Sequence, residues 1–333
     1  MVTLYVTSLA KGNGKTAVSA SIGQRLLEEG KKVGFFKVVP GSQDTTTEGN
    51  DSDAVFMQSI LALKEPAEQI CPALGETRDL PDRTKKAVDQ VSKGKDVVIV
   101  EGGNYPEIAK ALKARVIIVD TAVDSPWNAL LSAGKAFGDL LLGVVLNKVP
   151  NSQVEKVCNQ APVELAKEGI NTLAVLPEDR ALFALTIGEV ATQVQGEFLN
   201  NAEKSEELVE NLMLGAMTVD TGPLYYGLKT NKAVVLRSER SDMQLAALQT
   251  STRCLVLSGK QELIPQVISE AEGRGVPVIQ TDDDVATIIS SIENALTTNR
   301  FNQAEKLPRL TEIMEQHLDF EALYKGLGLT SKK

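Results

Sequence analysis

The chain has 333 residues, a formal net charge of −9 at pH 7 and an isoelectric point near 5.0. This length favours about two domains. The acidity argues against nonspecific binding to nucleic acid or to anionic membrane surfaces. The sequence has no apolar run approaching about 18 residues and enters its first predicted strand without a signal peptide. We therefore expect a soluble, cytoplasmic protein without a membrane or nucleic-acid partner.

Short runs rich in Val, Ile and Leu alternate with helical patterns through roughly the first 195 residues. The strands predicted from these runs are Leu4–Val6, Val33–Val38, Val97–Val100, Val116–Val119, Leu142–Leu146 and Leu173–Leu176. Continuous apolar strands separated by helices indicate a parallel sheet that helices cover on both faces. Ligands of such sheets bind at the C-terminal edge of the strands, so we expect the functional residues there.

A polar stretch at residues 193–203 marks the predicted domain boundary, and the strand and helix patterns restart beyond it. Later strands are expected at Ala233–Leu236, Cys254–Leu257 and Val276–Ile279, and helices from Asp242, at Glu262–Glu272 and at Val285–Leu296. A terminal amphipathic helix is expected at Leu310–Tyr324. We predict an α/β protein with a first domain at 1–198, a smaller α/β domain at 203–300 and a helical tail at 301–333.

The segment SLAKGNGKT, at residues 8–16, lies between the first predicted strand and a helix. Glycines let the backbone aim several N–H groups at a phosphate, and the helix N-terminus adds partial positive charge. Lys15 can reach the terminal phosphates and the Thr16 hydroxyl can bind Mg²⁺. The alternative is an ordinary turn between a strand and a helix. The predicted nucleotide contacts are Gly12, Asn13, Gly14, Lys15, Thr16 and Ala17, with Lys15 also a catalytic candidate.

Carboxylates end two of the predicted strands. Glu101 follows the apolar run at 97–100 and precedes two glycines, whereas Asp120 ends the run at 116–119. A carboxylate at the mouth of an apolar strand is costly to bury unless it meets a cation, which Mg²⁺ beside the phosphate loop would supply. We favour Glu101 over Asp120 as the acidic Mg²⁺ ligand, because the glycines permit close approach. Either residue could instead cap a helix.

Further charged residues follow the second predicted strand. Lys37 is either a contact to substrate or phosphate, and so a second catalytic candidate, or a solvated lysine at a strand end. Asp51 and Asp53 lie in a loop rich in Gly and Thr, where they could hold Mg²⁺ through water or cap a helix at Ala54. The predicted metal ligands are thus Thr16, Asp53 and Glu101.

Asn147 ends the fifth apolar strand, in the segment GVVLNKVP, and its amide offers both a donor and an acceptor to a base edge. The segment from Asn147 to Pro150 resembles the base-reading motif of GTPases, but Pro150 stands where that motif has the aspartate that reads the amino group of guanine, so we expect adenine. Pro177, in VLPEDRAL, is predicted to line the same base pocket, although this segment could instead be a turn that starts a helix.

SLAKGNGKT, GFFKVVP, VIVEGG, GVVLNKVP and VLPEDRAL occur in the order seen in the dethiobiotin synthetase-like ATPase family, which residues 1–195 resemble. They are similar to the branch at the N-terminus of long bacterial phosphotransacetylases and to cobyrinic acid a,c-diamide synthases. The later part, with SERSDMQ at 238–244 and GVPVI at 275–279, resembles the DRTGG domain. The resemblance implies a P-loop NTPase sheet with Mg²⁺ and ATP as cofactors.

The chain departs from these families in several places. Leu9 replaces the first glycine of the usual loop, and Ala10 occupies the position of the extra lysine of the partitioning ATPases. SERSD replaces the segment that gives the DRTGG domain its name. No counterpart of the phosphotransacetylase acyltransferase domain or of the glutaminase half of the amidating enzymes is recognised.

These features support three hypotheses. The first is a nucleotide- or metabolite-sensing regulatory ATPase, expected to form a homodimer and to bind an adenine nucleotide and a small acidic metabolite. The second is an ATP-dependent ligase that phosphorylates a carboxylate or a carbamate. The third is a non-catalytic scaffold, against which Lys15, Thr16 and Glu101 count.

Overall fold

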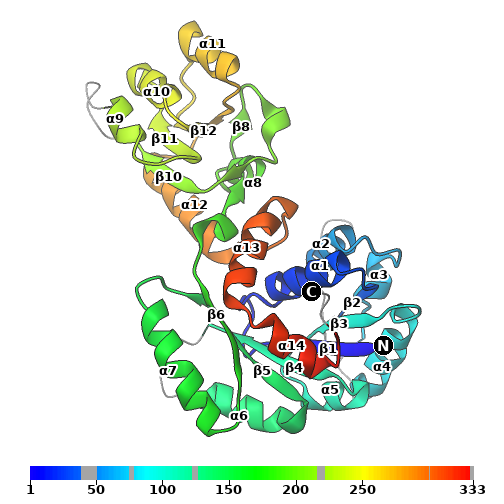
Figure 1. Ribbon diagram of the computed structural model, residues 1–333. Helices are drawn as coiled ribbons and strands as arrows, with labels where there is room; N and C mark the ends of the chain where they lie inside the picture. Colours follow the sequence, from blue (N-terminus) through cyan, green and yellow to red (C-terminus); the bar gives the residue numbers. More distant parts are fainter. Residues whose placement is uncertain (39–50, 75–78, 122–126, 216–221, 300, 331–333) are drawn as a thin grey trace. The chain divides into compact units, whose positions relative to one another are not determined.

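The computed structural model describes residues 1–38, 51–74, 79–121, 127–215, 222–299 and 301–330 (Figure 1). The chain divides into two compact units. The first comprises Met1–Asp179 and Phe301–Lys333, and the second comprises Arg180–Arg300. Each unit has its own sheet and its own core, as expected for an α/β chain of this length.

The first unit is built on a six-stranded sheet in the order β2-β3-β1-β4-β5-β6, in which every pairing is parallel. Its strands are β1 Val2–Thr7, β2 Val33–Lys37, β3 Val97–Glu101, β4 Arg115–Asp120, β5 Leu141–Val149 and β6 Thr172–Pro177. The predicted parallel sheet is therefore confirmed. Because β1 lies between β3 and β4, the loop after β1 is adjacent to the ends of both.

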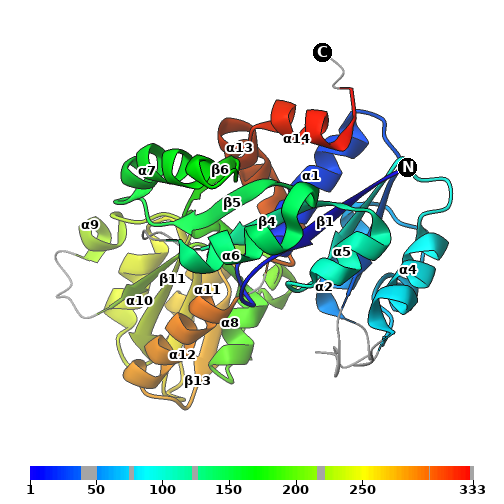
Figure 2. The same cartoon turned by 90° about the horizontal axis from the view of Figure 1, so that it is seen from below.

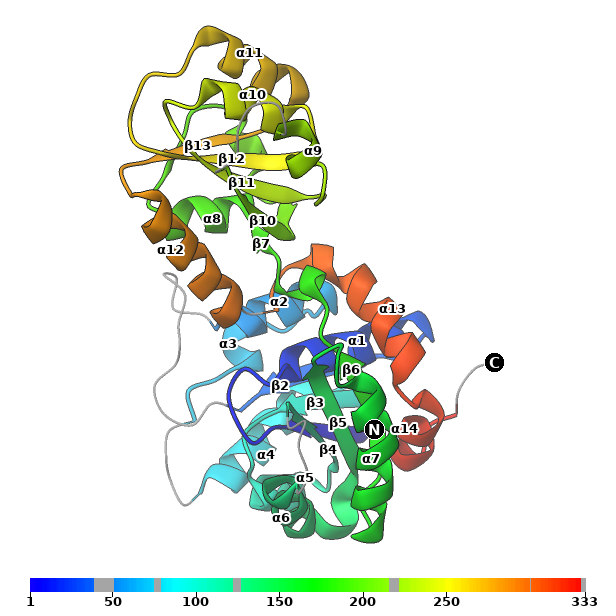
Figure 3. The ribbon, with the colours of Figure 1, turned by 90° about the vertical axis from the view of Figure 1, so that its left-hand side faces the viewer.

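Helices cover both faces of this sheet (Figure 3). One face packs against α4 Leu80–Val91, α5 Pro106–Leu112, α6 Asn128–Phe137 and α7 Val154–Lys167, through a core that includes Trp127 and Phe137. The other face carries α1 Lys15–Glu28, with α2 Ser52–Ile60, α3 Ala67–Ile70, α13 Leu307–His317 and α14 Phe320–Leu327 in the same unit. The strands are buried on both sides, which explains their continuous apolar sequences.

The second unit has a five-stranded sheet in the order β10-β11-β12-β13-β8, in which only β8 is antiparallel. The strands are β8 Glu197–Phe198, β10 Asn211–Leu214, β11 Lys232–Arg237, β12 Thr252–Ser258 and β13 Val278–Thr281; β7 Leu185–Thr186 pairs with β9 Leu208–Val209. The helices are α8 Ile187–Gln193, α9 Gly222–Tyr226, α10 Ser241–Leu248, α11 Pro265–Arg274 and α12 Val285–Thr298. One core lies under α8 and α12, and a second lies under α9, α10 and α11.

The observed units differ from the predicted division at the boundary. The chain enters the second unit at Arg180, not near residue 198. The reason is packing, because Ile187 and Val190 of α8 are fully buried in the same core as Val235 and Cys254. The polar residues 193–203, which include β8, therefore lie within the second unit and do not separate two units.

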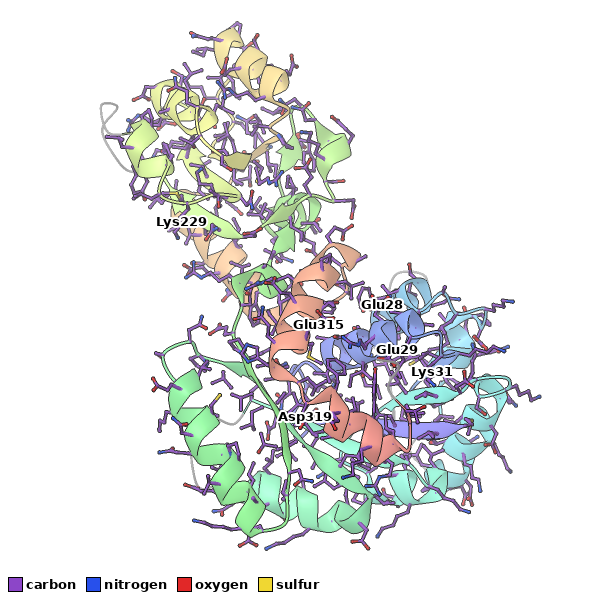
Figure 4. All side chains as sticks on the ribbon, in the orientation of Figure 1. Glu28, Glu29, Lys31, Lys229, Glu315 and Asp319 are labelled. Carbon is purple, nitrogen blue, oxygen red and sulfur yellow. The ribbon has the colours of Figure 1, made fainter. Side chains whose placement is uncertain are left out.

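The C-terminal segment also differs from the predicted separate tail, because it belongs to the first unit. Arg25 of α1 contacts Glu315 of α13 at 2.8 Å, and its guanidinium lies 4.9 Å from the centre of the Phe320 ring in α14. Figure 2 shows α14 beside α1, and Figure 4 labels Glu315 on α13. The predicted single helix is two helices, because Asp319 caps a new one by accepting a bond from the Ala322 N–H.

Candidate functional site

The phosphate-loop segment connects β1 to α1 at the C-terminal edge of the first sheet. Gly14 precedes the helix with a φ of 93°, in the left-handed region that favours glycine. A Cβ atom added to Gly14 would also collide with the side-chain amide of Asn147. The sequence therefore needs glycine at position 14 for both its backbone conformation and its close contact.

Lys15 lies at the first position of α1 and folds back over the loop. Its ammonium donates to the Ser8 hydroxyl at 2.7 Å, and Ser8 donates to the carbonyl of Ala10 at 2.7 Å. Burial is the largest influence on Lys15 and lowers the pKa of its ammonium, although Glu101 and Asp53 act in the opposite direction. Ser8 therefore helps to place the lysine, a role that the sequence analysis did not assign to it.

Thr16 and Glu101 meet as the sequence suggested. The Thr16 hydroxyl, in the first turn of α1, donates to Oε1 of Glu101 at the end of β3, at 3.0 Å. Glu101 is only 3% exposed, and its Oε2 atom is buried without a hydrogen-bond partner among the residues that the structure describes. Burial, with a smaller contribution from Asp53, raises the pKa of the Glu101 carboxyl to about 7, against the opposing effects of Lys37, Lys15 and Thr16.

This arrangement fits a divalent cation. A buried carboxylate oxygen that lacks a donor is stabilised by a metal ion, and oxygen ligands are those that Mg²⁺ prefers. Glu101, Thr16 and the nearby carboxylate of Asp53 would hold it. Within the described ranges, no group of three or more His, Cys, Asp or Glu side chains is arranged to hold a metal alone. The remaining ligands would therefore come from phosphate oxygens and water.

Lys37 at the end of β2 is tied to two carboxylates. Its ammonium lies 2.8 Å from both oxygens of Asp51 and 2.6 Å from Oδ2 of Asp53. Asp51 also caps α2, because its Oδ1 accepts from the Ala54 N–H at 3.0 Å. Lys37 is thus neither solvated nor alone. Of the two roles considered for Asp51 and Asp53, the structure shows the helix cap, which Asp51 provides, while a metal role for Asp53 stays a prediction.

Asp120 ends β4, which lies on the other side of β1 from β3, and it bonds to the loop. It accepts from the Asn13 amide at 2.8 Å and from the Thr121 N–H at 2.7 Å. Asn13 is 5% exposed and is therefore fixed by a buried bond. The structure consequently brings Glu101, and not Asp120, to the hydroxyl of the predicted metal ligand.

Two residues at the end of β5 also brace the loop. Asn147 donates to the carbonyl of Asn13 at 2.9 Å, and Lys148, at a φ of 56°, donates to the carbonyl of Gly12 at 2.9 Å. Pro177 lies at the paired end of β6, opposite Val149. Asn147 lies at this edge of the sheet as predicted from the sequence, whereas the contact of Lys148 with the loop was not predicted. The Asn-Lys pair at a strand end was the signal that could have revealed it.

Residues 2–184 match the AAA domain family, and this match covers more than half of the chain. The chain belongs to the AAA domain family. Residues 189–295 match the DRTGG domain. The predicted order of a P-loop domain followed by a DRTGG domain is therefore confirmed for this AAA domain protein.

The AAA domain protein is similar to the phosphate acetyltransferase of Nitrosomonas europaea, with 24% identity over 98% of this chain and 52% of the relative. It spans about half the length of such relatives. It is 38% identical over 74 residues to the ATP-dependent dethiobiotin synthetase of Salmonella typhimurium, a match that covers 22% of this chain and 32% of that relative.

Among solved structures, this AAA domain protein is similar to the cobyrinic acid a,c-diamide synthase of Mycobacterium smegmatis with bound ADP and magnesium. The identity is 19% and the TM-score is 0.36, over 54% of this chain and 87% of that one. In the part of the chain that the structure describes, no helix is long and apolar enough to cross a membrane.

Proposed function

We propose that this protein binds Mg-ATP at residues 12–17 and acts as a nucleotide- or metabolite-sensing regulatory protein. The observation that carries the proposal is the pair formed by Thr16 and Glu101, with the buried, unpartnered Oε2 of Glu101 beside the loop. The AAA domain match over the same residues supports it. Adenine is the proposed base, with Asn147 and Pro177 in its pocket.

Each residue has a defined part in this proposal. Backbone N–H groups from Gly12 to Ala17 and the ammonium of Lys15 would bind the phosphates. The hydrogen bond that the Lys15 ammonium donates to Ser8 already holds this side chain at the loop. Part of the conformational entropy that Lys15 would lose on binding phosphate is therefore lost before the nucleotide binds. When bound, Mg²⁺ would neutralise phosphate charge and orient the terminal phosphates. The expected homodimer and the small acidic metabolite belong to the same proposal.

The first prediction concerns the loop lysine. Mg-ATP should raise the unfolding temperature of the protein, because a ligand at a hundredfold excess over its Kd stabilises the folded state by about 2.7 kcal/mol. Lys15→Ala should abolish this shift, whereas Lys110→Ala, which removes an exposed lysine of α5, should retain it. Differential scanning fluorimetry with ATP, ADP and GTP at millimolar concentration measures the effect. No shift with any nucleotide would contradict the proposal, and a larger shift with GTP would contradict the choice of adenine.

A ligase of the dethiobiotin synthetase type is the second candidate, which the local 38% identity favours. Lys37 would then contact the carboxylate or carbamate that is phosphorylated. ADP formation that depends on an added small carboxylate distinguishes this activity from sensing, in which the same compound changes nucleotide affinity without being consumed.

A further inference from the structure

The Lys37 ammonium occupies a position that a metal ion would compete for. It lies 2.6 Å from Oδ2 of Asp53, the proposed metal ligand, and 2.8 Å from both oxygens of Asp51. The three side chains are 13%, 13% and 4% exposed, respectively. Solvent therefore screens these charges poorly, and the ion pairs are stronger than those of a surface lysine.

The Lys37 ammonium supplies the positive charge that the surrounding carboxylates would otherwise draw from a bound cation. Asp51, Asp53 and Glu101 all act on Lys37 electrostatically, and Glu101 also faces Lys15. A divalent cation at Thr16 and Glu101 would use Asp53 as a further ligand, but the Lys37 ammonium already bound to this carboxylate repels it. In a site of low dielectric constant, two cations beside one carboxylate repel each other strongly.

We propose that Lys37 is an exchangeable counter-cation, which pairs with Asp53 in the absence of a divalent cation and leaves it for the anionic phosphate or acidic group when that cation binds. This inference rests on the proposed function of the site. Asp51 is the partner that Lys37 keeps during the exchange. Its Oδ1 accepts from the Ala54 N–H, which fixes it to α2, while both of its oxygens hold the ammonium. Lys37 can then change one partner and keep the other.

The exchange couples metal binding to anion binding. Lys37 weakens metal binding when no anion is present, because Asp53 must first be released. The same lysine strengthens anion binding when the metal is present. Such coupling is reciprocal, and couplings of this kind usually change affinities by about 5- to 150-fold. Metal and nucleotide would therefore enter this site together more readily than either enters alone.

The test uses Mn²⁺ in place of Mg²⁺, with free Mn²⁺ measured by electron paramagnetic resonance, and ATP binding measured by calorimetry with Mn²⁺ or with EDTA. Lys37→Met should tighten binding of Mn²⁺ alone by about fivefold or more. It should lower the affinity for Mn-ATP, yet change the affinity for metal-free ATP by less than about twofold. Lys95→Met is the matched control, since Lys95 is a partly buried lysine paired with Glu65 just before β3, at the opposite end of that strand from Glu101.

A double-mutant cycle assigns the effect to Asp53. In the Asp53→Asn background, Lys37→Met should change the Mn²⁺ affinity by less than about twofold. Lys37→Arg should preserve the wild-type Mn²⁺ affinity, because the guanidinium can still pair with both carboxylates. If Lys37→Met does not fold, the Lys37 ammonium signal of the wild type provides the test, since NMR should show it shift when Mg²⁺ is added without nucleotide.

Three results would overturn the exchange. The first is that Lys37→Met leaves the Mn²⁺ affinity unchanged or lowers it. The second is that Lys37→Met lowers the ATP affinity equally with and without metal. The third is that Mg²⁺ does not shift the NMR signal of the Lys37 ammonium. In each case the wild type still binds Mn-ATP, so the proposed function survives. A wild type that binds neither Mn²⁺ nor ATP would instead refute the proposed function, and the exchange with it.

Discussion

Lys37 and Glu101, two charged residues near the loop, differ in how well the surrounding residues stabilise their charged forms. Although burial opposes it, the carboxylates of Asp53, Glu101 and Asp51 raise the pKa of the Lys37 ammonium above its ordinary value. Glu101 has an unpartnered oxygen, and burial raises the pKa of its carboxyl group. In this site the Lys37 ammonium is therefore well paired, whereas the ionised form of Glu101 is poorly stabilised. A bound metal ion would stabilise that ionised carboxylate.

The Glu101 carboxyl group should make stability depend on pH in the absence of metal. Its pKa is about 7 in the folded protein and close to 4.5 when unfolded, so the folded state binds more protons between these values. This group's contribution to the free energy of unfolding should be complete below pH 4.5 and fall as the pH rises towards 7, by an amount on the order of a few kcal/mol. Glu101→Gln should remove this fall.

Urea denaturation at pH 5, 6, 7 and 8 with EDTA measures the effect. Asp120→Asn is the control, because it changes another buried carboxylate at this edge of the sheet but leaves Glu101 in place, so the fall that Glu101 causes should persist. Equal pH slopes for wild type and Glu101→Gln would show that this carboxyl group titrates normally. Adding Mg²⁺ and ATP should flatten the wild-type profile as well, because the cation stabilises the ionised form.

Among the elements, α1 connects the loop to the C-terminal helices. Its first residues are Lys15 and Thr16, and near its other end Arg25 contacts Glu315 while Glu29 accepts from the Tyr324 hydroxyl at 3.0 Å. The last two helices therefore support the helix that carries the candidate site. Their apolar residues are part of the first unit and do not form an independent tail.

Met314 tests this support, because its side chain on α13 is fully buried. Met314→Ala should lower the free energy of unfolding by about 2–5 kcal/mol, as large-to-small substitutions in cores usually do. Gln316→Ala, at an exposed position of the same helix, should change it by less than about 0.5 kcal/mol. Denaturation followed by circular dichroism compares the two. If Met314→Ala were as mild as its control, the helix would be a loosely attached tail.

For the whole molecule, the boundary at Arg180 predicts which fragments of the chain can fold on their own. Residues 180–300 include both cores of the second unit and should unfold in one cooperative urea transition. A fragment of residues 199–300 lacks α8, whose Ile187 and Val190 are fully buried, and should unfold at a lower urea concentration or not fold at all. Equal midpoints would mean that α8 is dispensable and that the boundary predicted near 198 is the better one.

The sequence alone determined the parallel α/β fold, the loop from Gly12 to Thr16 and the strand that ends at Glu101. These features are local, because apolar runs, glycines and a charged residue at a strand end can be seen within a few positions. The DRTGG region was also recognisable from short segments, although its boundary was not. The roles of Lys37, Asp53, Asn147 and Pro177 in binding remain predictions.

Tertiary structure decided which side chains meet. Lys37 pairs with Asp51 and Asp53, which are 14 and 16 positions further along the chain, and Lys148 of β5 donates to the Gly12 carbonyl, 136 positions away. Neither contact follows from composition or periodicity, because each depends on how separate segments of the chain are brought together at one edge of the sheet. The docking of α13 and α14 has the same origin. An amphipathic pattern shows that a helix has an apolar face, but only the folded chain determines which surface that face covers.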